Sequence, residues 1–132
     1  MASLKKSSAQ LVAEARDRIE EIETPDLIAM LDDPDVVVVD IRDIRERQRT
    51  GFIPGSYHAP RGMLEFWVDP ESPYFKEVFS ESREIVLFCQ SAWRSALATA
   101  ALQDMGLDGV CHFESGFGGW KKSGGPTVAR DK

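Results

Sequence analysis

A cysteine and an arginine five positions apart are the residues whose types and spacing could support covalent chemistry in this chain. Cys89 follows the apolar run at residues 85–88 and precedes a segment of helical composition at residues 96–102. This pattern predicts a buried strand that ends in a short loop and continues into a helix. Unpaired N–H groups and the positive end of a helix dipole lie at such a helix start. They favour the thiolate, so we expect Cys89 to be a nucleophile rather than a buried structural cysteine.

The length and composition indicate one domain with a normal hydrophobic core. The chain has 132 residues, and its two cysteines, Cys89 and Cys111, lie in separate strand-like runs. A disulfide framework is therefore not expected, and a reduced, cytoplasmic setting fits better. We see no secretory signal and no apolar run of membrane-spanning length. The net charge of −6 disfavours nucleic acid and anionic membranes as partners, and any attraction for an anionic substrate must be local.

Strands and helices are expected to alternate along the chain. Residues 36–39 are apolar on both faces, as in a central parallel strand, and further strands are expected at residues 57–59, 85–88 and 109–113. Apolar residues recur at helical spacing through Leu11, Val12, Ala15, Ile19 and Ile22. Further helices are expected at residues 26–31, 43–48, 61–68, 94–105 and 116–122. The alternation predicts an α/β fold with a mainly parallel sheet.

Three segments, in order, are similar to one family. The first is Val39-Asp40-Ile41-Arg42 with Glu46 and residues 51–56, the second is residues 89–98, and the third is Gly116-Phe117-Gly118-Gly119-Trp120 with residues 124–126. With these segments the chain resembles a single-domain rhodanese, a sulfurtransferase, from about Glu21 to Val128. The resemblance implies a central, mainly parallel five-stranded sheet with helices on both faces. We expect the rhodanese domain at residues 21–132, preceded by a helical extension at residues 1–20.

Two positions depart from the family pattern. Phe52 stands where the family usually has His, which is more a marker of the fold than a catalyst. Ala92 stands where the loop usually has Gly. If that position requires a positive φ, alanine carries about 1 kcal/mol or more of strain there. Cys89 and Arg94 are intact, so activity is expected to be retained.

The resemblance implies sulfur transfer through Cys89 without a cofactor. The thiolate attacks the outer sulfur of thiosulfate or a related donor, and cyanide or a thiol then removes that sulfur from a Cys89 persulfide. Two half-reactions through a covalent intermediate predict ping-pong kinetics. Related cell-cycle dual-specificity phosphatases and arsenate reductases carry five residues between Cys and Arg, whereas this loop has four. The smaller ring favours a single sulfur atom over a phosphate or arsenate.

The loop after Cys89 is expected to stabilise a persulfide anion through its backbone. Successive N–H groups of residues 90–95 would curl around the anion as a nest. The segment contributes Gln90, Ser91, Ala92, Trp93, Arg94 and Ser95. The side chains of Gln90, Ser91 and Trp93 are expected to shape only the entrance.

Two arginines have open roles. Arg94 could bind the oxyanion of the donor with its guanidinium fork, or it could pair with carboxylates and brace the loop. Arg61 lies in a segment expected near the carboxyl ends of the strands, where open α/β sheets bind ligands. It could supply local positive charge to the substrate, or it could be a solvated arginine at a helix start.

The remaining polar candidates are interpreted mainly as structural. Asp40, Arg42 and Glu46 are expected to form a hydrogen-bonded network between strand and helix, with acid–base chemistry as the alternative. His58 and His112 lack partners at metal-ligand spacing, so no metal site is expected. Cys111 is expected to be inert core, with a resolving role toward Cys89 as the minor alternative.

Competing functions remain open at this point. The chain could be a persulfide carrier or sensor that docks to a partner protein, and an exposed Trp93 beside the nucleophile would suit such docking. A cysteine-dependent phosphatase or arsenate reductase is less favoured because of the loop length. An inactive binding module is disfavoured because Cys89 is present.

Overall fold

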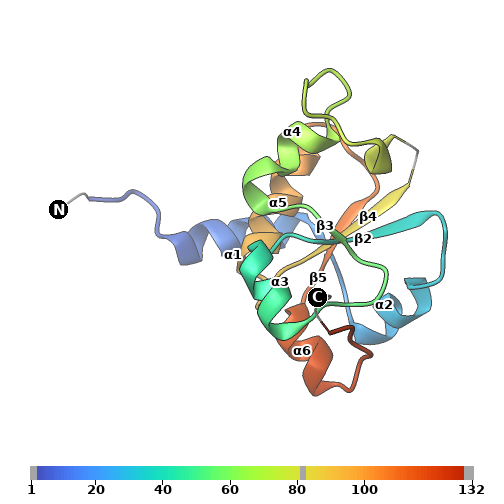
Figure 1. Ribbon diagram of the computed structural model, residues 1–132. Coiled ribbons are helices and arrows are strands. Elements are labelled where there is room, and N and C mark those ends of the chain that lie inside the picture. Colours follow the sequence, from blue (N-terminus) through green and yellow to red (C-terminus); the bar gives the residue numbers. More distant parts are fainter. Residues whose placement is uncertain (1–2, 81–82, 130–132) are drawn as a thin grey trace.

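The computed structural model describes residues 3–80 and 83–129, so the predicted extension (1–20) and domain (21–132) each include residues outside these ranges. A five-stranded parallel sheet with the strand order β1-β5-β4-β2-β3 forms the centre of the chain (Figure 1). The strands are β1 (Glu20–Ile22), β2 (Val36–Asp40), β3 (Tyr57–His58), β4 (Glu84–Phe88) and β5 (Val110–Phe113). This architecture confirms the predicted α/β fold and its parallel sheet.

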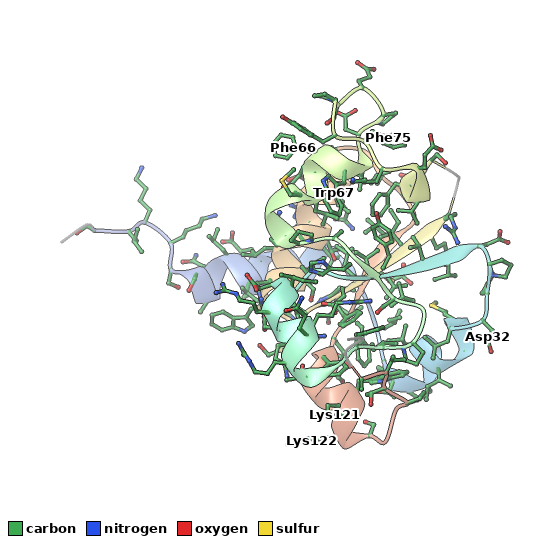
Figure 2. The ribbon with its side chains drawn as sticks, viewed as in Figure 1. Asp32, Phe66, Trp67, Phe75, Lys121 and Lys122 are labelled. Carbon is green, nitrogen blue, oxygen red and sulfur yellow. The ribbon has the colours of Figure 1, made fainter. Side chains whose placement is uncertain are left out.

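Helices cover both faces of the sheet, as predicted. They are α1 (Ser8–Arg18), α2 (Thr24–Met30), α3 (Ile44–Thr50), α4 (Leu64–Val68), α5 (Trp93–Asp104) and α6 (Gly116–Lys122), with 3-10 turns at Arg61–Met63 and Glu77–Phe79. Helices α4 and α5 pack on one face and α2 and α6 on the other. In Figure 2, Trp67 of α4 points toward the interior, whereas its neighbour Phe66 points outward and is half exposed. Within the described residues no helix is long and apolar enough to cross a membrane.

The two central strands bring the chemistry-bearing residues to one edge of the sheet. Side chains of β2 and β4 alternate between two cores, with Val39 and Leu87 in one and Val38 and Val86 in the other. Both faces are therefore covered, and this explains the uninterrupted apolar runs. Asp40 is paired in register with Phe88, so the end of β2 lies beside the loop that begins at Cys89.

The expectation that the first helix continues to Ile22 was wrong. Helix α1 ends at Arg18, Ile19 is extended, and Glu20–Ile22 forms β1 beside β5. Ile22 is buried in the sheet core rather than on a helix face. Ile22 matched the helical spacing by coincidence. A strand also points alternate side chains inward, and Ile22 is the inward-facing residue of β1. Helix α1 packs on α5 through Val12 and Ala15.

A buried ion cluster fixes the end of β2. Asp40 and Arg42 are fully buried, and their side chains form two hydrogen bonds, Nε to Oδ1 at 3.0 Å and Nη2 to Oδ2 at 2.9 Å. Arg47 of α3 joins from the other side, with Nη1 at 3.1 Å from Asp40 Oδ2. The predicted network of Asp40, Arg42 and Glu46 differs in one member: Glu46 pairs with Arg94 instead, and Arg47 is the third member of the cluster.

The glycine-rich start of α6 closes onto the Cys89 loop. Phe117 donates its N–H to the Cys89 carbonyl at 2.8 Å, and Gly118 donates to the Gln90 carbonyl at 3.2 Å. Gly116 has φ +67°, and a Cβ there would overlap the carbonyl group of Gln90. Both constraints exclude other residues at Gly116, since only glycine combines a positive φ with so close an approach of two backbones.

Removal of the Asp40 carboxylate should severely destabilise the chain. In Asp40→Ala the buried guanidinium of Arg42 and the partly buried one of Arg47 lose their counter-ion, so we expect the free energy of unfolding to fall by about 3–5 kcal/mol. Urea denaturation measures this change. As the matched control, Glu14→Ala breaks an exposed pair with Lys6 and should change stability by less than about 1 kcal/mol. Equal losses in the two variants would contradict this account of the cluster.

Gly116→Ala should destabilise the chain much more than Gly118→Ala does. The first variant combines strain at a positive φ with backbone overlap and should cost about 2 kcal/mol or more. The second places its Cβ 3.3 Å from the flexible Gln90 side chain, inside a helix, and should stay within about 1 kcal/mol of the wild type. Unfolding in urea tests both, and similar stabilities would show that the approach of α6 to the loop is not tight.

Candidate active site

Cys89 lies at the base of the loop between β4 and α5. Its side chain is buried, and Sγ accepts a hydrogen bond from the Ala92 backbone N–H at 3.1 Å. Helix α5 begins one residue later, at Trp93, so the sulfur faces the N-terminal end of a twelve-residue helix. A backbone donor and the helix dipole both favour negative charge on this sulfur.

Ala92 has the backbone conformation that directs its N–H toward the sulfur. It has φ +86° and ψ −11°, and it is the only non-glycine residue with a positive φ in the part of the chain that the structure describes. Its side chain is buried, so the loop accommodates the methyl group. The left-handed conformation explains why the family pattern has Gly here, and for alanine it costs about 1–2 kcal/mol. Strain at this position is part of the geometry of the loop.

Arg94 and Glu46 form a two-pronged ion pair at the side of the loop. Nη1 lies 2.7 Å from Oε1, and Nη2 lies 3.0 Å from Oε2. The hydrogen bonds to Glu46, with a contribution from the nearby Cys89 sulfur, raise the pKa of Arg94 above its ordinary value. The hydrogen bond from Arg94 in turn lowers the pKa of Glu46. This pair supports the interpretation that Arg94 braces the loop.

Gln90, Ser91 and Trp93 have different environments. The Gln90 side chain accepts a hydrogen bond from Arg42 Nη1 at 3.3 Å, and its backbone carbonyl accepts from Gly118. Ser91 is exposed, and Trp93 is 49% exposed at the first position of α5. Gln90 thus ties the loop to the buried cluster, whereas Trp93 offers a large apolar side chain to the surface.

Arg61 is held by a neighbour on its own segment. Its Nη1 lies 2.9 and 3.1 Å from the two carboxylate oxygens of Glu65. Its backbone N–H donates to the Ile41 carbonyl at the end of β2, so the segment does lie at the carboxyl edge of the sheet. The guanidinium is already partly neutralised, and a role in substrate binding stays a prediction.

Phe52, which stands where the family usually has His, packs against an arginine. The Arg47 guanidinium lies 3.8 Å from the centroid of the Phe52 ring. Arg47 also donates to the carbonyl and hydroxyl of Ser56. The ring covers an arginine that holds Asp40, which is a cation–π contact with a structural purpose.

Cys111 and His58 lie in structural surroundings. Cys111 is buried on β5, and burial raises the pKa of its thiol to about 12, so it is a poor nucleophile at neutral pH. His58 Nε2 lies 2.7 Å from the Arg42 carbonyl. No group of three or more His, Cys, Asp or Glu side chains that could hold a metal ion occurs among residues 3–80 and 83–129.

His112 is the polar residue of the site that sequence reasoning missed. It is fully buried on β5, with Nδ1 2.8 Å from Ser95 Oγ and Nε2 2.8 Å from Glu21 Oε2. A histidine inside an apolar strand was the available signal in the sequence. A polar side chain that is buried requires hydrogen-bond partners, so such a histidine indicates a buried polar contact. Its partners lie 17 and 91 residues away, so no local pattern could identify them.

Comparisons with known proteins identify the family of the chain. A family model described as rhodanese-like domain matches residues 23–123. A sulfurtransferase of Allochromatium vinosum is 30% identical over 112 residues, which are 84% of this chain and 96% of that protein. An uncharacterised protein of Synechocystis is 33% identical over 70% of this chain, which spans about half (47%) of that protein.

One solved structure is similar over almost the whole chain. A Rhodopseudomonas palustris protein of unknown function, described as a possible tyrosine phosphatase, has a TM-score of 0.92 and 47% sequence identity. The match covers 97% of this chain and 98% of that one. The family model covers well over half of the chain and includes β2, β4, the Cys89 loop and α6. The chain therefore belongs to the rhodanese-like domain family.

Proposed function

We propose that the chain moves sulfane sulfur from thiosulfate or a related donor to a thiophilic acceptor, cyanide or a thiol, through a persulfide on Cys89. The observation that carries this proposal is the 3.1 Å contact between Cys89 Sγ and the Ala92 N–H at the start of α5. The sulfurtransferase of Allochromatium vinosum, matched over 96% of its length, supports the same reaction class.

The reaction divides into two half-reactions at one sulfur atom. In the first, the Cys89 thiolate attacks the outer sulfur of thiosulfate, a new S–S bond forms, and the old S–S bond breaks with its electron pair leaving on sulfite. In the second, the acceptor attacks the outer sulfur and Cys89 leaves as a thiolate. The Ala92 N–H and the N-terminus of α5 stabilise the anionic sulfur in both directions.

Phosphatase activity is the second candidate, because the Rhodopseudomonas palustris relative is described as a possible tyrosine phosphatase. Only four residues separate Cys89 from Arg94. Both terminal nitrogens of Arg94 are directed at Glu46, where a phosphatase would direct them at phosphate oxygens. Loop size and Arg94 therefore favour sulfur over phosphoryl transfer.

The acceptor could also be a protein, in which case the chain acts as a persulfide carrier. Trp93 supports this alternative because it is half exposed and adjoins the loop. Large aromatic side chains are common anchors in protein interfaces. Turnover with a protein thiol well above turnover with cyanide or glutathione would favour the carrier.

Thiosulfate treatment should load one sulfur onto Cys89. We expect intact mass to rise by about 32 Da in the wild type and in Cys111→Ser, because the covalent intermediate forms only on Cys89. Cys89→Ser should gain nothing, since a hydroxyl is not a comparable nucleophile at neutral pH.

Two results would contradict the proposal. A mass gain that persists in Cys89→Ser and disappears in Cys111→Ser would move the chemistry to Cys111. Hydrolysis of an aryl phosphate by the wild type, faster than its sulfur transfer from thiosulfate, would favour the phosphatase instead.

Arg94→Lys and Glu46→Gln distinguish bracing from donor binding. If Arg94 braces the loop, both variants break the same two-pronged pair, so both should lose kcat with thiosulfate and with an uncharged persulfide donor alike. If Arg94 binds the donor, Arg94→Lys alone should raise KM for thiosulfate. We expect the first pattern, with Tm lowered in both variants, and steady-state kinetics with the two donors provides the measurement.

A further inference from the structure

A chain of hydrogen bonds runs from the back of Cys89 to the surface. Cys89 Sγ lies 3.7 Å from Ser95 Oγ, which lies 2.8 Å from His112 Nδ1. His112 Nε2 is 2.8 Å from Glu21 Oε2, and the same oxygen accepts from Arg16 Nε at 2.7 Å. The chain therefore joins four elements, the first turn of α5, β5, β1 and α1, behind a single sulfur atom.

The burial of this chain falls off toward its outer end. Cys89 is 1% exposed, and Ser95 and His112 are fully buried. The side chains of Glu21 and Arg16 are 27% and 36% exposed. A proton that leaves the buried sulfur thus has a continuous path of side chains toward water.

The surroundings of His112 decide where its proton lies. Burial lowers the pKa of His112, against the hydrogen bond to Glu21, which raises it. Burial acts to raise the pKa of Glu21, but hydrogen bonds from His112 and Arg16 outweigh it and leave that pKa lowered. The charged groups that face His112 are Glu21 on β1, Arg16 on α1 and Glu114 after β5.

The lowered pKa values of His112 and Glu21 determine which atoms donate and which accept before the thiolate forms. A neutral His112 next to an ionised Glu21 carries its proton on Nε2, and Nδ1 is then an acceptor. The Ser95 hydroxyl donates to Nδ1 at 2.8 Å rather than to the more distant Ala92 carbonyl at 3.3 Å. A lone pair of Ser95 Oγ therefore faces the thiol of Cys89.

We propose that Ser95, His112 and Glu21 form a proton relay that takes the thiol proton of Cys89 when the thiolate forms. The S–H bond breaks and its proton passes to Ser95 Oγ, while the hydroxyl proton of Ser95 passes to His112 Nδ1. A thiol and a neutral imidazole become a thiolate and an imidazolium, so the net charge of the site does not change. The transfers reverse when the sulfur is protonated again.

Each member has a separate task in the relay. Ser95 touches the reacting atom, His112 accepts the proton from Ser95, and Glu21 is a positioning residue that acts through His112. Glu21 holds the tautomer of His112 and stabilises the imidazolium once it forms. The inference rests on Cys89 as the reacting thiol of the proposed function, although no step of the relay involves a sulfur donor.

The relay is tested by titration of the Cys89 thiolate through its ultraviolet absorbance, with Cys89→Ser as the blank. Cys111, with a pKa of about 12, does not interfere near neutral pH. We expect Glu21→Gln to raise the midpoint by about one pH unit, which is about a tenfold loss of thiolate below the midpoint. Through space alone, removal of a negative charge would lower the midpoint, so the sign of the shift separates the relay from simple electrostatics.

A double variant tests whether Glu21 acts through Ser95. Ser95→Ala should also raise the midpoint, and Ser95→Ala with Glu21→Gln should raise it no further. Thr99→Val is the matched control, because the Thr99 hydroxyl is buried on the same helix and makes no hydrogen bond within the described residues. It should leave the midpoint unchanged.

The outcomes separate the relay from the proposed function. A wild-type or lowered midpoint in Glu21→Gln, or additive shifts in the double variant, would overturn the relay while thiosulfate still adds sulfur to Cys89. Loss of the mass gain in the wild type, with the midpoint shifts intact, would instead overturn the sulfur transfer.

Discussion

A guanidinium group that is removed from water must have each of its N–H donors satisfied, and Arg42 meets this requirement with side chains and backbone from several elements. It bonds twice to Asp40, and it donates to Thr50, to the Gly51 carbonyl and to Gln90. The face of the guanidinium lies 4.3 Å from the Phe117 ring centroid. The three sequence segments typical of the family therefore converge on one buried cation, and the position of the Cys89 loop depends on it.

Helix α3 connects this buried cation to the rim of the loop. Glu46 caps the start of the helix by accepting the Asp43 N–H at 3.0 Å, and the same carboxylate holds Arg94. One turn later Thr50 accepts from Arg42, and the helix also contributes Arg47 to the Asp40 cluster. This short, highly charged helix thus connects the buried cluster to the Cys89 loop. Arg45, Glu46 and Arg47 of this helix each form an ion pair within the chain.

Much of this arrangement could be predicted from the sequence because it is local. Apolar runs on both faces of β2 and β4 indicated a parallel sheet, and the spacing of Cys89, Arg94 and the next helix indicated a thiol at a helix start. The family pattern raised the condition of a positive φ at Ala92, and the structure has it.

The failures concern side chains that meet across long sequence separations. Nothing local shows that Glu46 pairs with Arg94, which lies 48 residues away, rather than with Arg42. The end of α1 at Arg18 depends on β1 pairing with β5, about 90 residues away. His112 shows its importance only when its two ring nitrogens are placed between Ser95 and Glu21.

The family match begins at residue 23, yet Arg16 and Glu21 both precede it. Arg16 and Glu21 are nevertheless linked through His112 and Ser95 to the Cys89 sulfur. Under the proposed relay, two relatives with identical loops would differ in thiol acidity when their leading segments differ. Exchanging the residues ahead of the matched module between relatives would then change the chemistry of the thiol as well as the packing of the helix.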